Sequence, residues 1–247
     1  MINNKLLTRY EFKYFINNEV AKSIFEVALN FMNVDDFALR SKNKGYFVRS
    51  LYYDNPQYDN FFEKVDGMQV RKKFRLRTYE NKYKKNSIFY LEMKGRKQDR
   101  IIKKRTQIKI EDLKYFYSLN NLNKLQSKYR NNVLIEDFIF SEKRKKIRPR
   151  ILVDYSRKPL INKYGLYFRL TFDSNIIVSK SKSLFFEKNF NFPIKYNPGN
   201  TVLEVKFERS IPAWFHRVIQ TYSLNRKSIS KFVIGVCTCK EKSDTSD

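Results

Sequence analysis

Six short segments of the chain alternate residue by residue between apolar and polar side chains, which is the period of a half-buried β-strand. In the clearest of them, VRKKFRLR at residues 70–77, four cations share one face, namely Arg71, Lys73, Arg75 and Arg77. The other segments are RYEFK, FYLEMKGR, IKKRTQIKI, YFRLTFD and TVLEVKFE. The pattern predicts strands that have one apolar face and one charged face.

The remaining sequence predicts helices between the strands. Apolar residues at helical spacing indicate a helix over 18–32, which Asn17 or Asn18 caps, and further helices over 111–146 and 212–224. Strands are expected near residues 7–15, 46–54, 69–80, 87–95, 102–110, 150–157, 165–173, 176–179, 183–186, 201–208 and 231–238. The chain is therefore predicted to have an α+β fold of eight or so strands.

The charged faces allow two arrangements of the sheet. An open sheet would turn them to water as a basic surface. A closed sheet would turn them inward around one axis and place the helices on its apolar outside. The interior of an eight-stranded barrel is wide enough for side chains or one slim ligand. Because a dry interior packed with cations is strongly unfavourable, a closed sheet would have to be wet and to hold an anion. The pattern alone leaves both arrangements open.

The composition indicates a globular protein that binds a polyanion. With 247 residues, of which 42% are hydrophobic and 16% aromatic, the chain can bury the core of one domain. It has 51 Lys and Arg against 25 Asp and Glu, which gives a net charge of +26. Such self-repulsion destabilises a compact state unless a polyanion relieves it. The candidate partners are nucleic acid, an acidic membrane surface, nucleotides and inorganic phosphate chains.

Several sequence signals are absent, and their absence argues against a membrane protein, a zinc site and a Gly-rich phosphate loop. The chain has no run of 18 apolar residues and no signal-peptide core, so no membrane span is expected and a cytoplasmic location fits. Cys237 and Cys239 are expected on one short strand as structural thiols, because a zinc site would lack ligands with His216 as the one histidine. His216 itself is expected to be structural or exposed. No Gly-rich phosphate loop occurs, so side chains must bind any phosphate.

Eight short motifs, taken together, resemble one known family. In chain order they are RYEFKY, SLYYDNP, FRLRTYE, LEMKGR, KKRTQI, YFRLTFD, VLEVKF and SISKFVIGV. This set resembles the VTC domain, a polyphosphate polymerase domain of the triphosphate tunnel metalloenzyme (CYTH-like) superfamily, over about residues 8–236. The resemblance implies a closed antiparallel eight-stranded β-barrel with helices packed on the outside. It implies a single tunnel domain over 1–239, and the polar tail at 240–247 is expected to be disordered.

The resemblance also implies an enzyme. A VTC domain transfers the γ-phosphate of ATP to a growing polyphosphate chain and uses a divalent metal, Mn²⁺ or Mg²⁺. The expected partners are ATP and polyphosphate or triphosphate, with nucleic acid bound only non-specifically. One alternative is a triphosphatase of the same fold that uses the same residues with water as the acceptor. Another is a non-catalytic module that binds RNA or other polyanions, although the known RNA-binding signatures are missing.

The resemblance assigns candidate site residues motif by motif. The expected catalytic residues are Arg75, Arg77, Lys94, Arg169 and Lys231. The expected substrate-binding residues are Lys13, Arg71, Lys103, Arg105, Arg157, Lys206 and Ser230. Glu204, in the LEVK motif, is the expected metal ligand.

Other residues of the motifs are expected to be structural. Glu11 and Glu92 are expected to pair with neighbouring cations. Arg9 stands where the superfamily usually has an acid, which leaves fewer ligands for a second metal. The remaining structural residues are expected to be Tyr53, Asp54 and, as an acid in a turn, Asp173.

Overall fold

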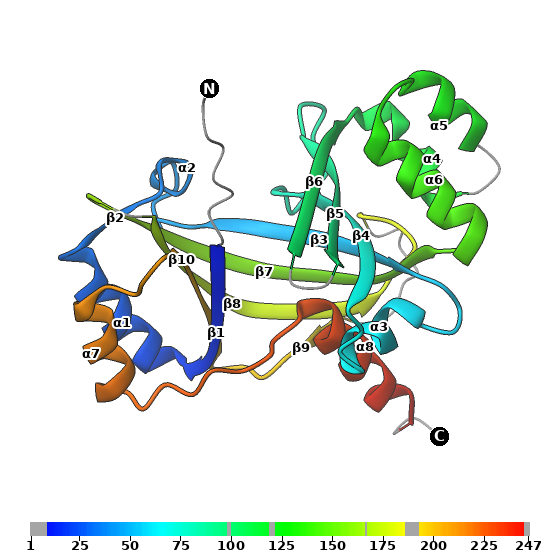
Figure 1. The fold of residues 1–247 in the computed structure, drawn as a ribbon. Coiled ribbons are helices and arrows are strands. Elements are labelled where there is room, and N and C mark those ends of the chain that lie inside the picture. Colours follow the sequence, from blue (N-terminus) through cyan, green and yellow to red (C-terminus); the bar gives the residue numbers. More distant parts are fainter. Residues whose placement is uncertain (1–8, 98–99, 119–121, 166, 186–192, 245–247) are drawn as a thin grey trace, which may run out of the picture. The chain divides into compact units, whose positions relative to one another are not determined.

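The computed structural model describes residues 9–97, 100–118, 122–165, 167–185 and 193–244, and it has an α+β fold with a large antiparallel sheet (Figure 1). The strands are β1 Arg9–Asn17, β2 Met32–Val34, β3 Tyr46–Asp54, β4 Val70–Thr78, β5 Phe89–Lys97, β6 Arg100–Ile108, β7 Arg148–Asn162, β8 Phe168–Lys180, β9 Ile194–Lys195 and β10 Asn200–Glu208. The helices are α1 Asn18–Leu29, α2 Asp36–Leu39, α3 Asp59–Val65, η1 Ile110–Asp112, α4 Lys114–Tyr117, α5 Leu122–Lys128, α6 Val133–Lys145, α7 Ala213–Thr221 and α8 Lys231–Asp244. The sequence pattern did not predict β2, α2, α3 and β9, all of which are short.

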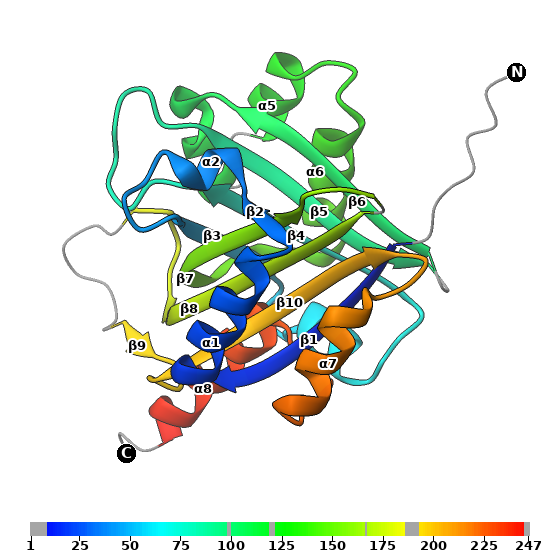
Figure 2. The same ribbon diagram turned by 90° about the vertical axis from the view of Figure 1, so that its left-hand side faces the viewer.

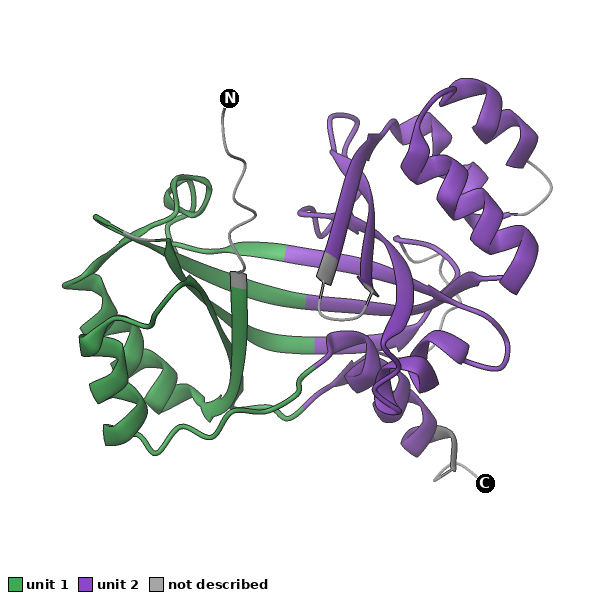
Figure 3. Cartoon of the chain, viewed as in Figure 1, with its two compact units in different colours: residues 1–47, 155–176, 197–229 green, residues 48–154, 177–196, 230–247 purple. Residues whose placement is uncertain are grey.

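The chain divides into two compact units (Figure 3). Unit 1 comprises Met1–Phe47, Tyr155–Ile176 and Asn197–Ile229. Unit 2 comprises Val48–Asp154, Ile177–Tyr196 and Ser230–Asp247. Strands β3, β7 and β8 contribute residues to both units.

In unit 1, strands β1, β10 and β8 are paired in antiparallel fashion, and β2 pairs with the end of β7. Helices α1 and α7 lie on one side of these strands (Figure 2). Their buried residues, including Ile24 and Phe215, join Leu170 and Leu203 of the strands in one apolar core. As predicted, an asparagine caps α1, because Asn17 Oδ1 accepts a hydrogen bond of 2.8 Å from the Val20 backbone N–H.

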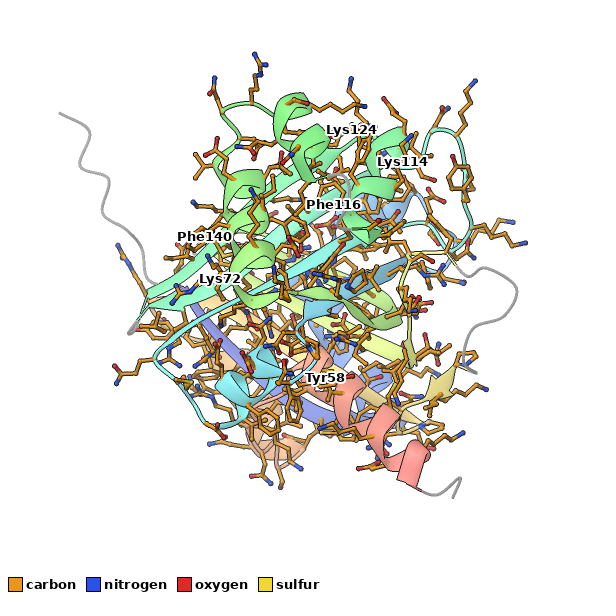
Figure 4. All side chains as sticks on the ribbon, turned by 90° about the vertical axis from the view of Figure 1, so that its right-hand side faces the viewer. Tyr58, Lys72, Lys114, Phe116, Lys124 and Phe140 are labelled. Atoms are coloured by element: carbon orange, nitrogen blue, oxygen red, sulfur yellow. The ribbon has the colours of Figure 1, made fainter. Side chains whose placement is uncertain are left out.

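In unit 2, strands β4, β5 and β6 form an antiparallel meander, and β3 pairs with β4. The apolar faces of these strands pack with helices α4, α5 and α6 in a second core, in which Phe74 and Leu91 of the strands join Phe138 of α6. Lys72 also lies on this face, where its Nζ is 2.6 Å from Asp137 Oδ1 of α6 (Figure 4). Arg75 and Arg77 therefore lie on the face of β4 that turns away from the core.

The strand predicted at 231–238 is wrong, because this segment begins helix α8. Cys237 and Cys239 accordingly lie on a helix. The β-branched and apolar residues here suit a strand, but Phe232, Val236 and Cys239 recur at helical spacing and all three are buried. A short apolar run does not by itself distinguish a strand from a helix. Here the burial of one helical face favours the helix.

The strands predicted at 165–173 and 176–179 are parts of one strand, β8. The sequence Asp-Ser-Asn at 173–175 favours a turn. Asn175 does take a positive φ of 53°, which asparagine tolerates, but the strand continues through it. The strand predicted at 183–186 is absent from 183–185, which form a bend, and residue 186 lies outside the described residues.

The sheet has the strand order β1-β10-β8-β7-β3-β4-β5-β6. Within the described residues no hydrogen-bonded ladder joins the outer strands β1 and β6, so hydrogen bonds do not close the sheet and the closed barrel stays a prediction. Helix α8 includes residues 240–244 of the segment expected to be disordered, and 245–247 lie outside the described residues. In the described part of the chain, no helix has both the length and the apolar character that crossing a membrane requires.

Candidate functional site

Each unit gathers charged side chains on the strand face that is opposite to its apolar core. In unit 1, β-sheet register places Lys13 opposite Glu204, and Lys206 opposite both Glu11 and Arg169. In unit 2, the register places Arg75 opposite Glu92, which is opposite Arg105 on the next strand. Each cluster has a buried glutamate that contacts several cations.

Glu204 is the centre of the cluster in unit 1. Its side chain is 8% exposed. Its Oε2 is 3.3 Å from Lys206 Nζ and 3.5 Å from Arg157 Nη2, and its Oε1 is 3.8 Å from Lys13 Nζ. The Thr171 hydroxyl also donates to Oε2 at 3.5 Å. Three cations therefore surround one buried carboxylate.

Arg157 is held in place by Asp173. The Arg157 Nε and Nη2 groups donate to the two carboxylate oxygens of Asp173 at 2.6 and 2.7 Å, a bidentate pair. Burial opposes the charge of Arg157, but Asp173, Tyr155 and Glu204 raise its pKa well above the ordinary value. Asp173 has a structural role, as predicted, because it is fully buried and orients Arg157, but it lies within β8 and not in a turn.

Lys13 and Arg169 complete the cluster in unit 1. Lys13 Nζ is 3.0 Å from Glu11 Oε1, the ion pair predicted for Glu11, and it donates to the Ile229 carbonyl at 2.9 Å. Arg169 Nη2 is 3.2 Å from Asp35 Oδ2. Among the described residues, the buried Nε of Arg169 has no hydrogen-bond partner.

Glu92 is the centre of the cluster in unit 2, and its side chain is 3% exposed. Its Oε2 is 2.6 Å from Arg75 Nη2 and 3.6 Å from Arg77 Nη1, and its Oε1 is 3.6 Å from Arg105 Nε. Burial alone would raise the pKa of Glu92, but the charges of Arg75, Arg77 and Lys103 hold it at about 2. The prediction that Glu92 forms ion pairs is confirmed.

Tyr52 belongs to this cluster, although it was not among the site residues predicted from the sequence. The Tyr52 Oη accepts a hydrogen bond of 3.0 Å from Arg75 Nη1. Burial would raise the pKa of the Tyr52 phenol, but Arg75, Arg77 and Lys231 together lower it below its ordinary value. The signal was the alternation of β3, which puts Tyr52 on the charged face.

The two residues that follow Tyr52 in the SLYYD motif have the structural roles predicted for them. Tyr53 points into the core, where its hydroxyl donates to the Phe116 carbonyl at 3.1 Å. The Asp54 carboxylate accepts hydrogen bonds from the backbone N–H groups of Asn55, Asn60 and Phe61, which fixes the turn before α3 and its start.

The remaining predicted site residues in unit 2 lie beside the Glu92 cluster. Lys94 and Lys103 are exposed and lie opposite each other on β5 and β6. The Ser230 hydroxyl accepts a hydrogen bond of 3.3 Å from Lys73 Nζ. Lys231, which begins α8, is 8% exposed, and its charge acts on Tyr52. Arg71 is half-buried and donates to the Met68 carbonyl.

The sequence pattern of the VTC domain matches residues 8–240, nearly the whole chain. The chain belongs to the VTC domain family. No curated protein matches the chain.

Solved structures have a fold similar to that of this VTC domain. A protein from Hippeastrum, described as a candidate adenylyl cyclase with a dominant triphosphatase activity, is 13% identical at a TM-score of 0.51, with 93% of this chain and 97% of that chain covered. A candidate adenylate cyclase from Bacillus halodurans is 13% identical at a TM-score of 0.50, with 89% and 92% covered. A protein from Pyrococcus horikoshii is 14% identical at a TM-score of 0.46, with 92% and 97% covered. Together with the family, the shared fold supports a triphosphate-handling enzyme.

The VTC domain has carboxylates that fit a metal ion bound together with phosphate. Lys13 Nζ contacts both Glu11 and Glu204, so two carboxylates of unit 1 face one positive charge. Mg²⁺ is commonly held by one or two carboxylates plus substrate phosphates. No group of three or more His, Cys, Asp or Glu that could hold a metal occurs within the described residues. The donor set therefore fits a metal whose other ligands are phosphate oxygens and water.

His216 and the two cysteines take no part in either cluster. His216 is exposed on α7, in agreement with its predicted role. Cys239 is buried on α8, where burial raises the pKa of its thiol and disfavours the reactive thiolate. Neither Cys237 nor Cys239 forms a disulfide bond within the described residues.

Proposed function

We propose that this VTC domain is a polyphosphate polymerase, which transfers the γ-phosphate of ATP to the end of a growing polyphosphate chain. The observation that carries the proposal is the arrangement around Glu92, where Arg75, Arg77 and Arg105 converge on one buried carboxylate. Arginine forks bind phosphate oxygens in the same bidentate way as they bind carboxylates. Membership of the VTC family supports a phosphate chain as the anion.

The proposed reaction needs positioning and charge neutralisation rather than a covalent intermediate. A terminal oxygen of the polyphosphate chain attacks the γ-phosphorus of ATP and forms a new P–O bond. The bond from the γ-phosphorus to the β–γ bridging oxygen breaks, and its electron pair stays on ADP. The chain becomes longer by one phosphate.

We assign the residues by their chemistry. The residues that contact the transferred phosphate would be Arg75, Arg77, Lys94, Arg169 and Lys231. The residues that bind the rest of the nucleotide and chain would be Lys13, Arg71, Lys103, Arg105, Arg157, Lys206 and Ser230. Glu204 would hold Mn²⁺ or Mg²⁺, which supplies positive charge to the phosphate oxygens when bound. The closed eight-stranded barrel belongs to this proposal, since a barrel of that size would admit a slim phosphate chain and exclude bulkier anions.

A triphosphatase is the second candidate function. The Hippeastrum protein with a similar fold is described by a dominant triphosphatase activity, and hydrolysis would use the same cations with water as the acceptor. The two functions differ in where the γ-phosphate goes. A module that only binds RNA or other polyanions would leave ATP intact.

The proposal is tested by incubating the purified protein with ATP and Mn²⁺, then measuring polyphosphate on a stained gel and free phosphate in the same sample. We expect a ladder of polyphosphate, little free phosphate, and loss of the ladder in Arg75→Ala. Removing this arginine should lower the rate about 30- to 1000-fold. Free phosphate without polyphosphate would make the protein a triphosphatase, and unchanged ATP would make it a binding module.

A further inference from the structure

A small pocket lies in unit 2 between α3, β4 and α6, and its volume is about 80 Å³. The side chains that line it include three apolar residues, Phe74, Phe140 and Ile147, and three cations, Lys72, Arg144 and Lys145. Lys72 and Phe74 alternate along β4 with Arg75 and Arg77, so they lie on the opposite face of the strand. The pocket is therefore separate from the Glu92 cluster.

Apolar side chains beside this pocket are exposed. Phe140 of α6 is 58% exposed and lies beside Lys72 of β4 (Figure 4). Val70, which shares the face of β4 with Lys72, is 66% exposed. A single exposed apolar side chain is ordinary, but these two border a pocket that reaches the buried core residue Phe74. Covering them with an apolar group of a partner would be favourable.

The pocket has more cations than neighbouring acids. Lys72 Nζ is 2.6 Å from Asp137 Oδ1, and Lys145 Nζ is 2.5 Å from Glu63 Oε1. Within the described part of the chain, Arg144 has no ion-pair or hydrogen-bond partner. Cations in the last turn of a helix interact favourably with the helix dipole, but that role requires neither the pocket nor an exposed aromatic residue beside it. The pocket therefore suits a ligand that combines an apolar group with negative charge.

The size of the pocket and the charge of the chain restrict the ligand further. An apolar cavity of about 150 Å³ holds benzene, so a pocket of about 80 Å³ fits one aliphatic side chain and is too small for a nucleobase. A bilayer presents headgroups to a protein surface, and these would not fill an apolar pocket. A second copy of this chain has the same net charge of +26 and would be repelled. An acidic segment of another protein has both of the required groups.

We propose that the pocket is a docking site for an acidic amphipathic helix of a partner protein. The helix inserts one aliphatic side chain against Phe140 and Phe74 and places a carboxylate beside Arg144. Amphipathic helices commonly bind in apolar grooves through such anchors. Phe140 and Arg144 are four residues apart on α6, so their side chains are neighbours on one face of this helix. The free arginine fork binds a carboxylate in bidentate fashion.

The test measures the fluorescence anisotropy of two labelled peptides of Leu, Glu and Ala near physiological salt. In one peptide the leucines recur at helical spacing, and in the other the same residues are scrambled. Phe140→Ser/Arg144→Gln changes the pocket. Val133→Ser/Lys124→Gln is the control, since it removes an exposed apolar side chain of α6 and an exposed cation of α5 that do not line the pocket. We expect the parent and the control to bind the patterned peptide about tenfold more tightly than the scrambled one, and the pocket variant to lose this preference.

Equal binding of the two peptides by the parent, a preference that the pocket variant keeps, or an equal loss in the control would overturn the inference. The same variants are compared for binding to phosphatidylserine vesicles and for self-association. A loss of either in the pocket variant, with the peptide preference kept, would assign the pocket to a membrane or to a second copy and overturn the inference. Melting temperature verifies folding and should not change, because both altered side chains are exposed.

The docking site does not depend on the proposed function. Polyphosphate synthesis from ATP should be unchanged in the pocket variant, because its two altered residues are not among those assigned to the reaction. If the parent makes no polyphosphate but shows the peptide preference, the docking site stands and the polymerase assignment fails. If the parent makes polyphosphate but binds both peptides equally, only the docking site fails.

Discussion

Two adjacent tyrosines of β3 have different roles because their side chains lie on opposite faces of the strand. Tyr52 and Tyr53 are adjacent on β3 yet face opposite sides, with one hydroxyl on Arg75 and the other on a core carbonyl. Alternation along a strand is enough to predict that separation. Which of the two faces binds a ligand depends on the partner strand, and the sequence of β3 alone does not contain that information.

We predict that Tyr52→Phe weakens the binding of inorganic triphosphate about tenfold, because a hydrogen bond to a charged group contributes about 1.5 kcal/mol. The ring and its contact with Phe232 remain, so Arg75 loses only the hydroxyl that orients it. Titration calorimetry measures the affinity. Tyr53→Phe is the matched control, and it should lower the free energy of unfolding by about 1 kcal/mol without changing affinity. Equal losses of affinity in both variants would refute a specific role for Tyr52.

We predict that Glu204→Gln lowers the metal-dependent rate about 100-fold and keeps part of the ATP binding. The charge that attracts the metal is lost, while Lys13, Arg157 and Lys206 still attract phosphate. The measurement is the rate as a function of Mn²⁺ concentration, together with nucleotide binding. Glu80→Gln, at an ion pair in the turn after β4, is the control. An unchanged Mn²⁺ dependence in Glu204→Gln would move the metal site to Glu11 or Glu92.

At the scale of elements, the strands were easier to predict than the C-terminal helix. Strand β3 has the predicted bounds, 46–54, because its neighbours in sequence are polar and its pattern is long. The segment 231–238 was misassigned because its β-branched residues favour a strand. Packing decides the matter: Gly235 of α8 lies against β7, and an added Cβ there would be 2.4 Å from Ile151 Cγ2.

We predict that Gly235→Ala destabilises the protein by about 1–3 kcal/mol, since the new methyl group overpacks the contact with Ile151. In a free helix the same change would stabilise by about 0.5–1 kcal/mol. The sign of the change in the free energy of unfolding, measured by urea denaturation, distinguishes the two cases. Thr238→Ala, a half-buried position of the same helix, should change it by less than about 0.5 kcal/mol. A stabilised Gly235→Ala protein would show that α8 does not pack closely on β7.

The meander β4–β6 should lose stability in acid because Glu92 holds its arginines together. The pKa of Glu92 is about 2 in the folded protein, against an ordinary value of 4.5. The ionised group therefore stabilises the fold fully above pH 4.5, and this contribution, at most about 3 kcal/mol, is lost as the pH falls towards 2. Urea unfolding between about pH 5 and pH 2 should show this loss in the parent and not in Glu92→Gln. Parallel curves for the two proteins would contradict it.

At the scale of the whole molecule, the proposed binding of a phosphate chain would account for both the charge of +26 and the charged strand faces. The sequence was sufficient for the α+β fold, for the family and for most of the residues in the two clusters. It was not sufficient for closure of the sheet, which depends on strands far apart in the chain. It also predicted a turn at Asp173, where the predicted strand 165–173 ended, whereas β8 continues to Lys180. The sequence of a strand is thus enough to predict its polar face. The residues that lie opposite that face on the neighbouring strands are known only from the register of the sheet.

The most direct test of the central claim, that these faces form a site for a phosphate chain, is competition. A fluorescent ATP analogue bound to the protein is displaced by polyphosphate or by RNA of equal total charge, near physiological salt, where exposed surface contacts are weakened. We predict that polyphosphate displaces the analogue at far lower concentration, because RNA carries sugars and bases that a narrow site excludes. Equal displacement by the two polymers would mean that the cations form an open basic surface that binds any polyanion by counterion release, and it would contradict the account.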